Sequence, residues 1–213
     1  MSGFPEALQP WWLIPLGYVV GATPFGFMAG KMKGLDIRDH GSGNIGATNA
    51  MRILGKPIGY TILFLDILKG LLPVLLAKSL GDSSLIAIAT AIAAIMGHNY
   101  TFWLGFKGGK GIATTAGAVV PILPIPILVA LLTWIITLKL SRYVSVASIA
   151  AAIAIPTTVV VQSLIAGKWD LAVLGLALFV CLLAIWKHRA NISRLRRGEE
   201  PRAEKKRKEP KPE

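Results

Sequence analysis

The stretch IATTAGAVVPILPIPILVALLTWIITLK, residues 112–139, decides how many times this chain can cross a membrane. It is apolar and uncharged until Lys139, and as one helix it would be about 42 Å long, more than the roughly 30 Å of a hydrocarbon core. Prolines 121, 124 and 126 interrupt it, and three prolines so close together break a helix. We therefore expect two short helices hinged at these prolines, either spanning the membrane or re-entering it.

The rest of the chain supplies five further apolar runs, each nearly free of charge. They cover residues 11–30, 57–78, 84–105, 143–166 and 170–187. Runs of this length can cross a bilayer as helices, and the 213-residue chain is 54% hydrophobic and only 16% charged. This composition predicts an all-α, polytopic membrane protein and excludes an ordinary soluble domain.

Basic residues mark the side of the membrane that faces the cytoplasm. The loop 31–56 holds five Lys/Arg, and residues 187–213 hold 11 basic and 5 acidic side chains, half of the net charge of +12. Both segments should be cytoplasmic, which requires 112–139 to begin and end on the same side. We expect about seven transmembrane helices, including the short proline-hinged pair, with the N-terminus outside and the C-terminus cytoplasmic.

The excess of basic residues does not indicate nucleic-acid binding, because these residues flank apolar spans and can contact anionic lipid headgroups. The end of the chain, PRAEKKRKEPKPE, has the composition of a disordered segment. We therefore expect residues 1–200 to form one transmembrane domain and residues 201–213 a disordered cytoplasmic tail.

The first of three polar segments on the expected cytoplasmic face is GSGNIGATNAMR, residues 41–52. Glycines let backbone N–H groups approach an anion closely, a helix starting near Ala47 would add partial positive charge, and Arg52 offers two hydrogen bonds to phosphate. A dinucleotide site is disfavoured, because no strand precedes the glycines and no acidic residue follows at the usual distance; a plain glycine-rich turn is the alternative. The candidate phosphate-binding residues are Gly41, Gly43, Asn44, Gly46, Thr48 and Asn49, with Ser42 beside them.

The second segment, GFKGGKGIATT (105–115), interleaves two lysines with glycines before an expected helix. It lacks the spacing of a P-loop but again suits an oxyanion, although Lys107 could simply be a positive-inside lysine. Its candidate phosphate-binding residues are Lys107, Gly108, Gly109, Lys110 and Gly111.

The third segment begins at His188, and Asn191 follows on the same helical face. A histidine here could donate, carry charge or act as a base. Within the spans, Asp66 and Lys69 are also three residues apart; both a structural ion pair and a catalytic role stay open. Ser145 lies on one face with other serines beside Arg142, where we favour a packing role.

In this order, GSGNIGATNAMR, GFKGGKGIAT and HRANISRLRRGEE resemble the three motifs of the bacterial acyl-phosphate:glycerol-3-phosphate acyltransferases. The resemblance covers about residues 11–200. It implies a multi-pass enzyme of the cell (inner or plasma) membrane that transfers a fatty acyl group from acyl phosphate to the 1-hydroxyl of glycerol 3-phosphate. The products would be lysophosphatidic acid and phosphate, in the first acylation step of phospholipid synthesis. Its partners would be these substrates and membrane lipids, with no acyl-CoA, metal or other cofactor.

Carried over position by position, the resemblance implies an active site on the cytoplasmic side. Its catalytic residues would be Ser42, Arg52, Lys110, Ser148, His188 and Asn191. The segment after Gly97 departs from the expected His-x-aromatic-Pro sequence, so His98 receives no role. For the proton of the attacking hydroxyl, a phosphate oxygen of the donor is our leading hypothesis and His188 the rival.

Two other functions compete with this one. A transporter or channel for an organic phosphate would need polar groups at mid-membrane and usually an internal repeat. Asp66 and Lys69 are the only residues in the spans that favour this function. A non-enzymatic insertion factor with a basic recruiting tail would leave the glycine–lysine loops unexplained.

Overall fold

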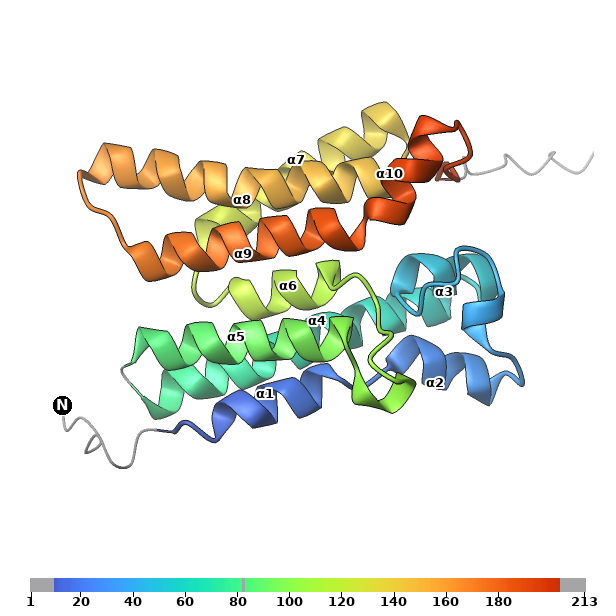
Figure 1. The fold of residues 1–213 in the computed structure, drawn as a ribbon, viewed down its shortest axis with the longest axis horizontal. Helices are drawn as coiled ribbons and strands as arrows, with labels where there is room; N and C mark the ends of the chain where they lie inside the picture. Colours follow the sequence, from blue (N-terminus) through green and yellow to red (C-terminus); the bar gives the residue numbers. More distant parts are fainter. Residues whose placement is uncertain (1–9, 82, 204–213) are drawn as a thin grey trace, which may run out of the picture.

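The computed structural model describes residues 10–81 and 83–203, and these residues form helices and loops without a β-strand (Figure 1). The helices are α1 (Leu13–Gly21), α2 (Phe25–Met32), α3 (Ala47–Ile53), α4 (Lys56–Leu80), α5 (Ser84–Asn99), α6 (Ile112–Val119), α7 (Pro124–Ser141), α8 (Val144–Ala166), α9 (Leu171–Lys187) and α10 (Arg189–Arg196). Short 3₁₀ turns lie at Ile37–Asp39 and Phe102–Leu104. The all-α prediction is therefore confirmed for the described residues.

Several helical segments are long and apolar enough to cross a membrane. Five qualify over the described residues: Leu13–Met32, Lys56–Leu80, Ser84–Leu104, Pro124–Ser141 and Val144–Ala166. A sixth results if α9 and α10, which meet at a bend of 51°, are taken together. The chain is thus a multi-pass membrane protein, and its orientation remains a prediction.

The proline-rich segment forms a broken pair of helices, but only the first of them is short. Helix α6 has 8 residues and at ~1.5 Å per residue is too short to span a bilayer. Helix α7 has 18 residues and meets the length of a span, so the expectation of two short helices was wrong for the second. Pro124 and Pro126 lie in the first turn of α7, where an N–H has no helical partner to lose, and only Pro121 falls in the break.

The helices form two groups that lie side by side in Figure 1, α1–α6 and α7–α10. In the first group α6 is held tightly against α4. A Cβ atom added at Gly70 would overlap the backbone of Thr114, and one at Gly117 would overlap the backbone at Ile67. Glycine at these two positions lets the helix backbones touch, which fixes the start of α6 and the glycine–lysine loop before it.

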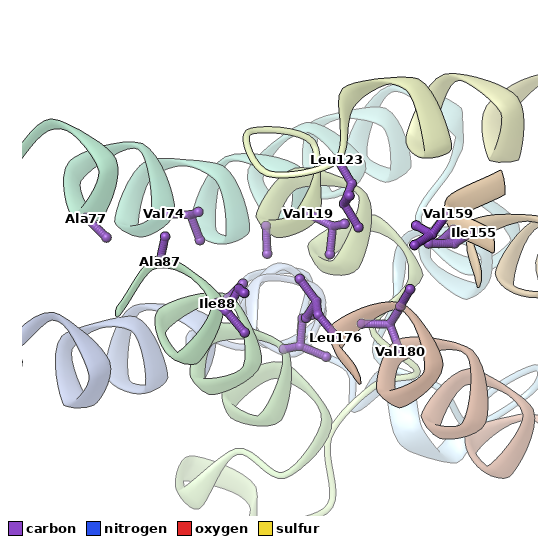
Figure 2. Packing of buried hydrophobic residues seen from close by; sticks show 14 of the residues in the cluster. Val74, Ala77, Ala87, Ile88, Val119, Leu123, Ile155, Val159, Leu176 and Val180 are labelled. Carbon is purple, nitrogen blue, oxygen red and sulfur yellow. The ribbon is translucent and has the colours of Figure 1, made fainter. Parts of the chain in front are cut away.

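Buried apolar side chains join the two groups at one end of α6. Figure 2 shows Val119 and Leu123 from α6 and the turn after it, together with residues of α8 and α9. Ile155 and Val180 are 5% and 2% exposed, so they lie in the interior of this cluster. The cluster closes the space between the two groups at this end.

Candidate active site

A cleft of about 430 Å³ lies between the two groups of helices. Its lining changes character along the helices that form it. On α8 it runs from Ser145 and Ser148 to Ile155, and on α9 and the bend after it from His188 to Val180, so one end is polar and the other apolar. At ~1.5 Å per residue the change takes place over about 10–15 Å. An amphiphilic molecule fits such a cleft.

The first motif forms a loop that is shaped around Asn49. This side chain is 1% exposed; its oxygen accepts from the Ser42 N–H at 2.9 Å, and its amide donates to the carbonyls of Ile37 and His40 at 3.2 and 3.0 Å. Gly41 has a φ of +60°, and a Cβ there would overlap the Asn49 oxygen. Asn49 and Gly41 therefore hold the loop in its bend.

Most of the predicted residues of this loop reach the cleft. Those that line it are Ser42, Asn44, Gly46, Thr48, Asn49 and Arg52. Gly41 and Gly43 do not line it; both have left-handed backbone conformations, with φ of +60° and +69°, so they serve the bend. Helix α3 begins at Ala47 as expected, and its Arg52 stands exposed at the rim of the cleft.

The second motif brings Lys110 into the cleft. Its Nζ donates to the Asn191 side-chain oxygen at 2.5 Å. Burial is the main reason that the pKa of Lys110 is lowered to about 8; Glu200 opposes this lowering, and Arg194 and Arg52 add to it. A bound phosphate would stabilise the charged form of Lys110 by accepting a hydrogen bond from its ammonium group.

The rest of this loop holds Lys110 in place rather than lining the cleft. Gly108 and Gly109 donate their N–H groups to the carbonyls of Asn99 and His98 at 3.2 and 3.1 Å, and a Cβ at Gly109 would overlap the His98 ring. Gly111, with a φ of +79°, does line the cleft. Lys107 is exposed and does not line it, so the structure does not place Lys107, Gly108 and Gly109 where we expected phosphate.

The third motif supplies His188 from the bend between α9 and α10 and Asn191 from the first turn of α10. Both side chains line the cleft, and the two residues are 3% and 4% exposed. The His188 Nδ1 lies 2.7 Å from the carbonyl oxygen of Ala184. Because a carbonyl only accepts, the neutral ring carries its proton on Nδ1 and keeps Nε2 as an acceptor.

Glu200 is a cleft residue that we did not predict. Its carboxylate accepts hydrogen bonds from Ser145 at 2.7 Å, Asn191 at 2.6 Å and Arg194 at 2.8 Å, and its side chain is 6% exposed. Burial alone would raise the pKa of Glu200, but these hydrogen bonds lower it below its ordinary value. Glu200 is thus an anion that links Asn191, and through it Lys110, to α8.

The contacts of Glu200 and of the residues after it change two predictions. Ser145, which we assigned to packing, lines the cleft and donates to this carboxylate. The segment after Glu200 also contacts the folded domain beyond the expected boundary at residue 200: the Arg52 guanidinium approaches the Pro201 carbonyl at 3.5 Å, and Ala203 N–H donates to the Arg142 carbonyl at 2.7 Å. Residues 204–213, the remainder of the expected tail, lie outside the described residues.

Ser148, Asp66 and His98 also belong to the lining of the cleft. The Trp134 N–H donates to the Ser148 hydroxyl at 3.3 Å. The Lys69 ammonium lies 2.8 Å from the Asp66 carboxylate, so the two residues form the ion pair that was one of the two expectations.

The cleft therefore combines a cationic polar end with an apolar end inside a membrane protein, and no group of His, Cys, Asp and Glu side chains in the described residues could hold a metal ion. These features define a class of membrane proteins that bind amphiphilic phosphates. Comparison with known proteins identifies the family within this class. Residues 11–198 match the family model described as glycerol-3-phosphate acyltransferase.

Curated relatives and solved structures agree. The chain is 44% identical to the glycerol-3-phosphate acyltransferase of Desulforamulus reducens, over 86% of this chain and 90% of that protein. It is 47% identical to that of Geotalea daltonii, over 88% and 94%. The crystal structure of PlsY (YgiH), an integral membrane glycerol 3-phosphate acyltransferase, in its glycerol 3-phosphate form superposes with a TM-score of 0.82 at 42% identity, over 90% of this chain and 94% of that one. Its lysophosphatidic acid form gives a TM-score of 0.79 at the same identity, over 90% and 93%.

The chain belongs to the glycerol-3-phosphate acyltransferase family of the PlsY type. It is accordingly an integral membrane acyltransferase of phospholipid synthesis.

Proposed function

We propose that this acyltransferase takes its acyl group from acyl phosphate and transfers it to the 1-hydroxyl of glycerol 3-phosphate, releasing lysophosphatidic acid and phosphate. The observation that carries the proposal is the placement of Lys110, half-buried and beside Arg52 and Arg194, at one end of a cleft whose other end is apolar. Two phosphate-bearing substrates bring about four negative charges at neutral pH. A cationic end of this kind can hold them, and the apolar end can hold the acyl chain.

The forms in which the two PlsY structures were solved support this choice of acceptor and product. One was solved with glycerol 3-phosphate and the other with lysophosphatidic acid, which are the acceptor and the product of the proposed reaction. The apolar half of our cleft, lined by Ile127, Ala130, Ile155 and Val180 among others, offers a place for the acyl chain of that product. Burial of each methylene there is worth about 0.8 kcal/mol.

The transfer itself needs little from the protein beyond placement and charge. The 1-hydroxyl oxygen attacks the carbonyl carbon of acyl phosphate, a new C–O bond forms, and the bond from that carbon to the phosphate oxygen breaks. Lys110 and Arg52 would stabilise the charge on the leaving phosphate, and one well-placed donor of this kind is typically worth ~10²–10³ in rate. We propose Ser42, Ser148 and Asn191 as further donors around the reacting groups.

For the hydroxyl proton, we propose that a phosphate oxygen of the donor accepts it. No hydrogen bond joins a cleft serine to His188 in the described residues, so a serine–histidine nucleophile has no support. The rival is His188, whose Nε2 is an acceptor. His188→Gln decides between them: a loss of more than ~10³ in kcat, together with loss of the limb of the pH profile that falls toward acid pH, would favour His188 as the base.

The polar end is proposed to face the cytoplasm, because the loops and helix ends around it carry the basic residues of the chain.

A matched pair of variants tests the site. Lys110→Ala should lower kcat/KM at least ~100-fold, whereas Lys107→Ala, which removes an exposed lysine of the same loop, should stay within about twofold of the wild type. Equal losses in both variants would show that the loop acts through its total charge and not through the placement of Lys110.

A further inference from the structure

Two titratable side chains at the floor of the cleft have no role in the proposed reaction. Asp66 comes from α4 and His98 from the end of α5, and both line the cleft although they are only 3% and 5% exposed. Keeping a carboxylate and an imidazole within a membrane-embedded bundle is costly unless they are partnered. Asp66 has Lys69 as its partner at 2.8 Å, whereas the buried Nδ1 of His98 has no hydrogen-bond partner within the described residues.

The His98 ring is oriented by its surroundings. Its Nδ1 lies 3.7 Å from an oxygen of Asp66 and is sealed from solvent without a hydrogen-bond partner in residues 10–81 and 83–203. Facing a carboxylate, Nδ1 is the nitrogen that carries the proton, and Nε2 is then left as an acceptor. The gap is too long for a hydrogen bond, but such contacts commonly tighten when substrate binds.

The other side of the ring contacts the loop that holds Lys110. A Cβ atom at Gly109 would overlap the ring at Nε2, so this nitrogen lies beside the residue that precedes Lys110. Lys110 and His98 line the same cleft, so the glycerol chain of a phosphate bound to Lys110 can extend toward His98. Lys69, which also donates to the Thr23 carbonyl at 2.8 Å, neutralises Asp66, so that the carboxylate does not repel the phosphate.

We propose that His98, positioned by Asp66, accepts a hydrogen bond from the 2-hydroxyl of glycerol 3-phosphate. The proposal rests on the proposed function. The apolar half of the cleft is built mainly by α6, α7, α8 and α9, so the reacting 1-hydroxyl must face these helices to meet the acyl donor. The hydroxyl that does not react is then free to face the opposite wall, where α4 and α5 supply Asp66 and His98.

The test compares two alcohols, glycerol 3-phosphate and 3-hydroxypropyl phosphate, which is the same molecule without its 2-hydroxyl. The wild type should prefer glycerol 3-phosphate by about 10- to 100-fold in kcat/KM, because a buried acceptor left unpaired is costly. His98→Asn places no atom at Nε2 and should reduce this preference to about threefold or less, whereas His98→Gln can place its oxygen near Nε2 and should keep about tenfold. Asp66→Asn disturbs the orientation of the ring and also removes the charge partner of Lys69, so it should lower activity with both alcohols and give an intermediate preference between them.

A merely structural role for His98 would lower activity with both alcohols and leave their ratio unchanged, and that result would overturn the proposal. A wild-type ratio near one would overturn it without any variant. If His98→Asn is inactive with both alcohols, calorimetric binding of each alcohol to the purified variant replaces the rates: equal, weakened binding supports the proposal, and retained preference or no binding of either contradicts it. If the wild type acylated neither alcohol, the proposed function would be refuted. The proposal about His98 could still be tested in that case, because the binding of the two alcohols can be compared without acylation.

Discussion

Replacing Glu200 with glutamine tests the hydrogen-bond network that holds the cationic end together. The two carboxylate oxygens accept from Ser145, Asn191 and Arg194, and Asn191 in turn accepts from Lys110. Glutamine keeps one acceptor oxygen, so at least one hydrogen bond to a charged group is lost, at a cost of about 1.5–3 kcal/mol. If this network positions Lys110 for the transition state, kcat/KM should fall about 10- to 100-fold.

The same variant should change the pH dependence. Lys110, with its pKa lowered to about 8, binds phosphate only in its charged form, which is lost as the pH rises. The wild-type kcat/KM should therefore fall above a pH of about 8, since this parameter reports the free enzyme. Glu200 raises the pKa of Lys110, so Glu200→Gln should shift this limb to lower pH.

The assay is the release of phosphate from acyl phosphate in the presence of glycerol 3-phosphate, measured with purified protein over a range of pH. Glu199→Gln is the matched control, because within residues 10–81 and 83–203 the Glu199 carboxylate pairs with Arg197 alone, at 2.7 Å, at the surface, with the two side chains 57% and 54% exposed. It should behave as the wild type. If Glu200→Gln stayed within twofold of Glu199→Gln and kept the same alkaline limb, the network would have no part in catalysis.

Two further variants test the ends of the cleft. Ile155→Phe adds volume where the apolar lining closes, so transfer from palmitoyl phosphate should fall at least about tenfold relative to lauroyl phosphate; an unchanged ratio in a competition assay would show that the acyl chain lies elsewhere. Gly109→Ala places a Cβ against the His98 ring and should cost about 1–3 kcal/mol of stability, seen as a lower Tm together with weaker activity. Gly175→Ala, where a Cβ meets no atom within 4 Å, is its control, and equal Tm values for the two variants would contradict the packing described for the loop.

The sequence was enough to predict the class of fold and most of the polar end of the site. Apolar runs and basic loops depend on composition, which is visible along the chain. The resemblance to the acyltransferase family implied the residues that meet in the cleft: Ser42, Arg52, Lys110, Ser148, His188 and Asn191. The positions of the proline-hinged pair could be predicted only in part. Whether a proline breaks a helix depends on the turn in which it lies, and for Pro124 and Pro126 this was the first turn of α7.

The roles of Glu200, Ser145 and the glycines before Lys110 depend on contacts between distant segments. Glu200 stands in a strongly charged stretch, and its meeting with Ser145, 55 positions away in sequence, is set by the fold of the segment after α10. The glycines at 108 and 109 looked like an anion-binding loop, but they face His98 and Asn99. Glycine patterns show where backbone can approach closely and do not show whether a ligand or another helix does so.

The identity of the acyl donor tests the account most directly. Purified wild-type protein would receive glycerol 3-phosphate with either palmitoyl phosphate or palmitoyl-CoA, and 1-acyl lysophosphatidic acid and free phosphate would both be quantified. We predict that palmitoyl phosphate gives the two products in equal amounts and that palmitoyl-CoA gives neither above background. Comparable product from palmitoyl-CoA, or no lysophosphatidic acid from palmitoyl phosphate, would contradict the proposed reaction.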